Sequence, residues 1–162
     1  MDSKYYNAKL INDRIKKGKH RNIIGGMWAE IGRLQLDFMK IMGLRPENYL
    51  LDIGCGCLRG GIQFVDYLDR GHYYGIDINK SLLDAGYNEI KSVALYDKLP
   101  LANLHCVDNF DASNFGRTFD FIIAQSVFSH LSFNNVRLCM ENIHKVIHSG
   151  GKFCATYFHR FL

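Results

Sequence analysis

Short apolar runs recur along this chain, and polar or glycine-rich stretches separate them. The clearest run, Phe121-Ile122-Ile123-Ala124, has no polar position, which is typical of a strand that is covered on both faces. Runs of this length with β-branched and aromatic residues indicate strands rather than helices. Strands are therefore expected over residues 49–53, 72–77, 102–107, 119–124 and 152–157.

The segments between these runs repeat their apolar residues with helical spacing. The longest such pattern covers residues 27–42, where Gly43 is a suitable C-cap and Pro46 prevents continuation. One face of this helix carries Trp28, Ile31, Leu34, Phe38 and Ile41, with Met27, Met39 and Met42 beside it. Further helices are expected over residues 58–68, from a cap at Asn79 or Ser81 to about residue 93, and over 132–147.

Strands and helices alternate throughout, so the predicted fold class is α/β, a Rossmann-like parallel sheet with helices on both faces. In such sheets ligands bind outside the carboxyl ends of the strands. Asp52, Asp77, Asp108 and Gln125 all fall at predicted strand ends. The sequence therefore places a binding site along that edge of the sheet.

The length of 162 residues suggests one domain, and the net charge of +4 is concentrated near the start of the chain. We expect a basic N-terminal segment over residues 1–24 and a domain over residues 25–162. A basic tail can contact nucleic acid or acidic lipid, but a solvated arm is the prediction here.

Five cysteines without a C-x-x-C spacing argue against a disulfide framework and against a zinc site, so no metal is expected. Free thiols are typical of a reducing compartment. The N-terminus has no apolar signal region, and no apolar run reaches the roughly 18 residues of a membrane span. These observations predict a cytoplasmic protein without a membrane span.

The most informative chemistry lies in residues 50–61. A strand ending in Asp52-Ile53 leads through Gly54-Cys55-Gly56 into a helix, and Asp77 closes the next strand. Glycines there allow a ligand to approach the backbone, and an acid at the second strand end can bind a ribose diol. The spacing predicts a nucleoside site.

Two residues decide which nucleoside is expected. The Asp52 carboxylate would repel a pyrophosphate but suits a cationic ligand. Arg59 stands where a dinucleotide fingerprint has its third glycine, so the pattern for NAD is incomplete. S-adenosylmethionine has an adenosine, an ammonium and a sulfonium but no phosphate, and it fits both observations.

Five blocks, in order and with matching spacing, resemble the class I S-adenosylmethionine-dependent methyltransferases. They are residues 50–61, 75–78, 109–111, 119–126 and 148–153. Residues 25–35 look like the leading helix of a bacterial, small-molecule-type branch of that family. The resemblance implies S-adenosyl-L-methionine as cofactor and methyl transfer to a small-molecule acceptor. Nucleic acid is not the expected acceptor, because Gln125-Ser126-Val127-Phe128 lacks the proline motif of base-flipping amino-methylating DNA enzymes.

The resemblance also assigns cofactor-binding residues. They are Asp52, Gly54, Cys55, Gly56, Arg59, Asp77, Ile78, Asp108, Asn109, Phe110 and Gln125. Asp77 binds ribose or caps the next helix, and Arg59 pairs with the methionine carboxylate or lies on the surface. Adenine is bound by Asp108 or by its neighbours. His130, after the fourth strand, is the candidate general base, against the alternative of a loop histidine without a catalytic role.

The chain departs from the family in two places. Leu58 replaces the glycine at the seventh position of the first motif. The chain also stops just after the fifth strand, whereas the family's sheet normally has seven. We expect a sheet truncated there, with self-association through the fifth strand or a longer natural polypeptide. Two further functions stay open: a non-catalytic or incomplete cofactor-binding module and, less favoured, an NAD-dependent oxidoreductase.

Overall fold

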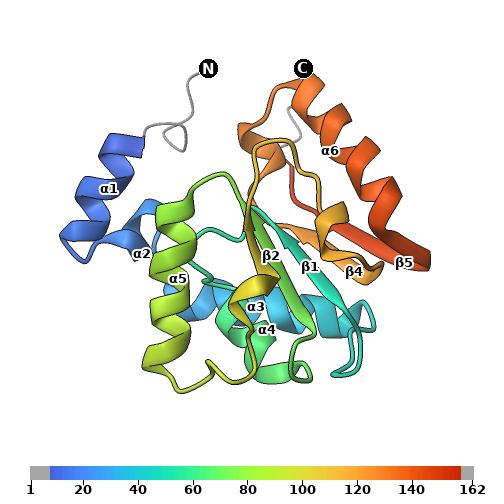
Figure 1. Cartoon of the computed structure of the whole chain (residues 1–162), viewed down its shortest axis with the longest axis horizontal. Coiled ribbons are helices and arrows are strands. Elements are labelled where there is room, and N and C mark those ends of the chain that lie inside the picture. The colour runs from blue at the N-terminus through green and yellow to red at the C-terminus, as the bar shows by residue number, and fades with distance from the viewer. Residues whose placement is uncertain (1–7, 158–162) are drawn as a thin grey trace.

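A five-stranded parallel sheet with helices on both faces forms the centre of the computed structural model, which describes residues 8–157 (Figure 1). The helices are α1 (Ala8–Lys16), α2 (His20–Ile23), α3 (Trp28–Ile41), α4 (Gly61–Tyr67), α5 (Lys80–Ser92) and α6 (Phe133–Val146). The strands are β1 (Leu50–Ile53), β2 (Tyr73–Asp77), β3 (Leu104–Cys106), β4 (Phe119–Ala124) and β5 (Ile147–Ala155). Short 3-10 helices are η2 (Leu101–Asn103), η3 (Ser113–Phe115) and η4 (Phe128–His130). The predicted α/β fold class is confirmed.

The strand order is β3-β2-β1-β4-β5. β2 and β3 therefore lie on one side of β1, and β4 and β5 lie on the other side. Asp52 on β1 is level with Gly75 on β2 and with Ile123 on β4. The order reverses between β1 and β4, and the carboxyl end of such a switch point is where this fold class binds ligands.

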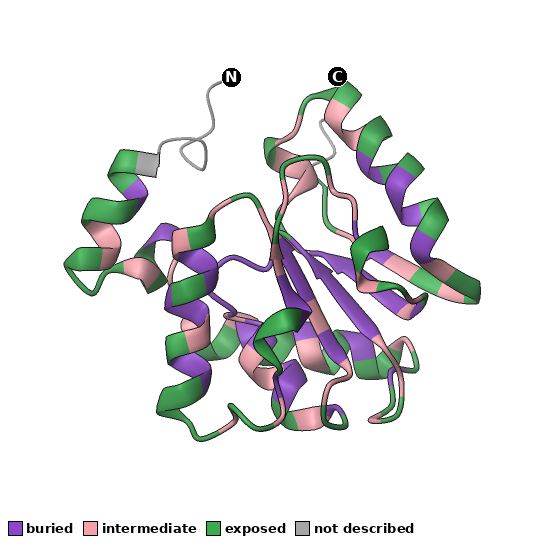
Figure 2. Cartoon of the chain, viewed as in Figure 1, coloured by how far each residue is buried: buried purple, intermediate pink, exposed green. Residues whose placement is uncertain are grey.

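Apolar side chains fill both faces of the sheet, and the central strands are buried along their length (Figure 2). On one face Leu50 and Ile123 pack with Met39 of α3, Phe64 of α4 and Ile90 of α5. On the other face α6 and the segment before β4 provide the cover. Within residues 8–157, no helix is long and apolar enough to cross a bilayer.

Most predicted elements are present, with shifted ends. β4 has the expected bounds, whereas α4 starts at Gly61 rather than at residue 58. Leu58 has a φ of +63°, which a right-handed helix does not allow. β5 starts at Ile147 because this residue already pairs with Phe119, and an irregularity in the register follows. β3 is limited to residues 104–106, after η2.

The apolar face predicted for α3 is not the face that packs against the core. Ile41 is 83% exposed and Leu34 62% exposed, whereas Gln35 and Met39 are buried. Periodicity shows that a helix has an apolar stripe, but contacts distant in sequence decide which side faces the core. Here Gly32 brings α3 against the backbone of Arg59, and this contact turns Gln35 inward.

The solvated arm predicted for residues 1–24 is also wrong over the described residues. α1 and α2 fold back onto α5, where Ile11 and Ile23 are buried with Leu82 and Ala85 (Figure 1). We call residues 8–26 the N-terminal strap. Residues 1–7, where the basic segment begins, and 158–162, where the predicted domain ends, lie outside the described residues.

Candidate functional site

A pocket opens at the carboxyl ends of β1, β2 and β4, as the sequence predicts. Ten of the eleven predicted cofactor-binding residues line it. The exception is Asn109, whose carbonyl oxygen accepts a hydrogen bond of 2.7 Å from Asn142 Nδ2 and whose side chain accepts from the Asp111 N–H. Asn109 therefore stabilises the loop after β3 rather than lining the pocket.

Asp52 lies in the pocket floor and is only 4% exposed. The hydroxyl of Tyr73, on β2, donates a hydrogen bond of 2.8 Å to its Oδ2. Burial raises the pKa of the Asp52 carboxyl to about 7, although the hydrogen bond from Tyr73 opposes the shift. The carboxyl is therefore poised between its neutral and charged forms at neutral pH.

The turn after β1 depends on two glycines. Gly54 has a φ of +69°, and a Cβ there would lie 2.5 Å from Val127 Cγ2. Gly56 has a φ of +56°, and a Cβ there would lie 3.3 Å from Ile24 Cγ2. Both positions need a left-handed backbone and both border the pocket, so a ligand can approach the main chain closely.

Leu58 takes the same left-handed conformation without being glycine, at a cost of about 1–2 kcal/mol. Its side chain is fully buried and occupies space left by two glycines on neighbouring helices. A Cβ on Gly61 would lie 3.0 Å from Leu58 Cδ2, and one on Gly86 would lie 2.7 Å from Leu58 Cγ. Burial of the Leu58 side chain thus offsets the strain of its left-handed backbone.

Asp77 connects the glycine turn after β1 with the turn after β2. Its Oδ2 accepts a hydrogen bond of 2.9 Å from the Gly56 N–H, and its Oδ1 accepts one of 2.8 Å from the Asn79 N–H. Burial raises the pKa of Asp77, and these backbone donors oppose the shift. The carboxylate braces the glycine turn and keeps lone pairs for a ligand, so bracing and ribose binding do not exclude each other.

The far end of the pocket lies beyond β2 and β3. Ile78 is 38% exposed at this end, and Asp108 and Phe110 follow β3. Phe110 has a φ of +61°, which turns the loop back toward the pocket. An apolar surface beside a carboxylate is a suitable environment for a purine base with an exocyclic amino group.

The loop after β4 forms the opposite wall with Gln125 and His130. Ser126 has a φ of +58°, and its N–H donates a hydrogen bond of 2.6 Å to Thr156 Oγ1 beyond β5. His130 ends η4 and is exposed at the pocket margin. The structure thus brings the candidate base to the pocket that contains the predicted cofactor residues.

The N-terminal strap supplies part of the pocket wall through Ile24. Arg59 Nη1 donates hydrogen bonds of 2.8 Å to the Ile24 carbonyl and 3.0 Å to the Gly26 carbonyl. Arg59 therefore lines the pocket and also fastens the strap across it. The side chain is half-buried and makes these contacts, and its pairing with a methionine carboxylate stays a prediction.

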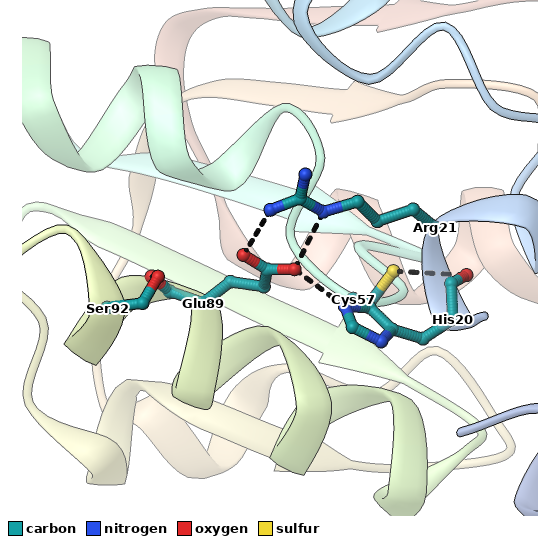
Figure 3. A network of polar contacts seen from close by, with 5 residues as sticks. All are labelled: His20, Arg21, Cys57, Glu89 and Ser92. Atoms are coloured by element: carbon teal, nitrogen blue, oxygen red, sulfur yellow. Dashed lines mark hydrogen bonds and ion pairs between the residues drawn. The ribbon is translucent and has the colours of Figure 1, made fainter. Parts of the chain in front are cut away.

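A polar network fastens the strap from the other side (Figure 3). Glu89 of α5 accepts hydrogen bonds of 2.8 Å from Arg21 Nε and from Nη2, and its Oε1 lies 2.6 Å from His20 Nε2. The hydrogen bonds from Arg21 lower the pKa of Glu89. The Arg21 guanidinium also lies 4.7 Å from the centroid of the Trp28 ring.

Sequence reasoning missed Gln35 and Ile24 as pocket residues. Gln35 had a detectable signal, because Gly32, Gln35 and Met39 share one helical face that is small or polar at two positions. Ile24 had none, since its place depends on the fold of the strap. The five cysteines are free, and burial raises the pKa of Cys55, which makes this pocket thiol a poor nucleophile.

Comparison with known proteins identifies the family. A family described as "methyltransferase domain" matches residues 51–153. The chain belongs to this family. The sequence-based recognition as a methyltransferase is therefore confirmed, and an NAD-dependent oxidoreductase is disfavoured.

The methyltransferase domain also resembles individual proteins. It is 30% identical over 109 residues to a probable fatty acid methyltransferase of Pseudomonas putida, covering 67% of this chain and 26% of that protein. Three curated relatives are covered over 26%, 29% and 45% of their own lengths, so the chain spans less than half of each.

Two solved structures show the same fold. One is the glycopeptide N-methyltransferase MtfA complexed with S-adenosyl-L-methionine, with a TM-score of 0.62 and 15% identity over 74% of this chain and 51% of that chain. The other is magnesium protoporphyrin IX methyltransferase from Synechocystis PCC 6803, with a TM-score of 0.62 and 16% identity over 91% of this chain and 74% of that chain.

Proposed function

We propose that this chain binds S-adenosyl-L-methionine and transfers its methyl group to a small-molecule acceptor. One observation carries the proposal: in a methyltransferase domain, Asp52, Gly54, Gly56 and Asp77 line one pocket at the switch point of the sheet. The acceptor class is supported by the names of the two solved neighbours, which are methyltransferases of a glycopeptide and of magnesium protoporphyrin IX.

The pocket residues fit the proposed cofactor. The buried Asp52 carboxyl has a neutral hydroxyl as its hydrogen-bond donor, and a ligand cation is a suitable counter-charge. The glycine turn gives access to the main chain, and Asp77 retains acceptor capacity for ribose hydroxyls. Ile78 and Phe110 supply an apolar surface for adenine. A pyrophosphate ligand would place its charge near Asp52, so NADH should not displace S-adenosylhomocysteine.

When bound, S-adenosylmethionine supplies an electrophilic methyl group on a sulfonium. The protein's own task is to align the acceptor in line with that group and to exclude water. The strap and the loop after β4 border the opening where an acceptor would enter. His130, at that margin, is proposed to take the proton from a hydroxyl or amine acceptor.

Calorimetry with S-adenosylhomocysteine and a turnover assay on candidate hydroxyl and amine acceptors test the function. His130→Ala should lower turnover by roughly 10²-fold or more while cofactor affinity is kept. Normal turnover of His130→Ala would remove its assignment as the base. Failure to bind S-adenosylhomocysteine would refute the proposed function itself.

A second candidate is a cofactor-binding module without turnover. The coverage of only 26% of the fatty acid relative favours it, because residues that bind an acceptor can lie in other parts of a longer protein. Binding without turnover on any acceptor would support this second candidate. A cytoplasmic location also stays a prediction, supported by the five free cysteines.

A further inference from the structure

A buried glutamine faces the pocket from α3 without a hydrogen-bond partner among residues 8–157. Gln35 is 7% exposed and lines the pocket, yet its side-chain amide makes no hydrogen bond within the described chain. The amide atoms are not among the fully buried polar atoms that lack a partner, so they are accessible from the pocket that Gln35 lines. A ligand in the pocket can therefore pair with an amide that no group of the described chain engages.

Two glycines bring Gln35 to this place. A Cβ on Gly32 would lie 2.6 Å from the carbonyl oxygen of Arg59, so α3 can approach the start of α4 only because Gly32 has no side chain. Gly60 lies directly against the Gln35 amide, and a Cβ at position 60 would clash with the amide oxygen. The close packing turns the amide toward the pocket floor rather than into the apolar core.

The order of the strands shows which end of a ligand Gln35 would meet. Asp77, Ile78 and Asp108 mark the end of the pocket at β2 and β3, where the proposed function places the nucleoside. Gln35, Asp52 and Gly60 mark the end near β1 and α4. The ligand group at that end would meet both an acid and an amide.

An α-amino acid group has the required chemistry. Its ammonium can donate to the Asp52 carboxylate, and its carboxylate can accept from Gln35 Nε2, while Gln35 Oε1 remains free to accept from the ammonium. A ligand that ends at the nucleoside would leave Gln35 without a partner and Asp52 with only the hydrogen bond from Tyr73.

We infer that Gln35 binds the amino-acid end of S-adenosylmethionine and makes the pocket selective for ligands that carry this end. The inference rests on the proposed function and adds a residue that determines specificity. Selectivity follows because a hydrogen-bonding site discriminates strongly against an analogue that lacks the matching group.

Two ligands that differ only at this end test the inference. S-adenosylhomocysteine carries the amino-acid group, whereas 5′-methylthioadenosine keeps the adenosine and the sulfur without it. Dissociation constants are measured by calorimetry, by competition where binding is weak, for the parent protein and for Gln35→Leu. Gln63→Leu is the matched control, because Gln63 is half-buried beside the same helix contact but does not line the pocket.

Gln35→Leu should weaken S-adenosylhomocysteine binding by roughly 10- to 100-fold and leave 5′-methylthioadenosine within about twofold. Gln63→Leu should change neither. Gln35→Met, a flexible side chain of similar length, serves in the same way if the leucine variant does not fold. Unchanged S-adenosylhomocysteine affinity, or equal losses for both ligands, would overturn the inference. Absence of binding of either ligand to the parent protein would instead refute the proposed function.

Discussion

Tyr73 of β2 donates a buried hydrogen bond of 2.8 Å to Asp52 of the neighbouring strand β1. The partner is a neutral phenol, and burial raises its own pKa well above the usual value. Tyr73 therefore orients the Asp52 carboxyl without neutralising its charge. A cationic ligand would supply the positive counter-charge that the hydroxyl lacks. Because that charge favours the ionised form of Asp52, ligand binding should depend on pH.

Affinity for S-adenosylhomocysteine should fall as the pH is lowered through 7. The free protein holds Asp52 with a pKa of about 7, and a bound ammonium favours the ionised form. Binding should therefore be about tenfold weaker at pH 6 than at pH 8. Calorimetry in two buffers of different ionisation enthalpy should also detect proton release near pH 7. Asp52→Asn should bind weakly with no such pH dependence, and equal affinity of the parent at both pH values would contradict the assignment.

Stability without ligand should change in the opposite direction. The pKa of Asp52 is raised from 3.8 to about 7 on folding, so its contribution is fully present below pH 4 and is lost as the pH rises through 7. Between pH 5 and pH 8 the parent should lose roughly 2–3 kcal/mol relative to Asp52→Asn. Urea unfolding of both proteins at the two pH values measures the difference. A constant gap between them would show that Asp52 is not perturbed.

Replacement of Asp77 should affect both binding and folding. Asp77→Ala should weaken S-adenosylhomocysteine binding by roughly 1–3 kcal/mol, because it removes the charged acceptor proposed for the ribose hydroxyls. It also leaves the N–H groups of Gly56 and Asn79 without their acceptor, so the free energy of unfolding should fall too. Asp77→Asn keeps one acceptor oxygen and should be less destabilised in urea. Unchanged affinity in the folded Asp77→Asn and Asp77→Ala variants would exclude the ribose role.

Glu89→Gln should loosen the N-terminal strap. The change removes the charge that holds Arg21 and His20, and about 1 kcal/mol is a reasonable loss since Arg21 is half exposed. Trp28 is the single tryptophan and lies against Arg21, so its fluorescence reports on the strap. Trypsin should also cleave the strap sooner, at its lysines and arginines. Asp84→Asn, which removes an exposed ion pair with Lys80 on the same helix, is the control and should change neither signal.

Self-association through β5 stays a prediction. β5 pairs with β4 on one side, and no strand within residues 8–157 pairs with its other edge. Thr156 N–H points to β4, so the preceding Ala155 N–H points to the open edge, and Ala155→Pro should block pairing there. Light scattering should find a dimer or larger species that Ala155→Pro reduces and Ala155→Val retains. A parent protein that scatters as an 18.6 kDa monomer would disprove association.

The sequence predicted what depends on local pattern. β4 has its expected bounds because a wholly apolar run has few other structures available, and the glycine turn and Asp77 follow from spacing. The exposed side of α3 and the docked strap were not predictable in this way. Glu89 meets Arg21 across 68 positions of sequence, and Gln35 is buried because of a helix contact at Gly32. Periodicity describes an element alone, and these features depend on its neighbours.

The pocket has a practical consequence for where the protein can be cut. The family match spans residues 51–153 and includes most of the strands, yet Ile24 and Gln35 lie before it. A version trimmed to the matched segment would lose one wall of the cavity and the strap that Arg59 holds in place. The segment that matches the family is therefore shorter than the segment that forms the complete pocket.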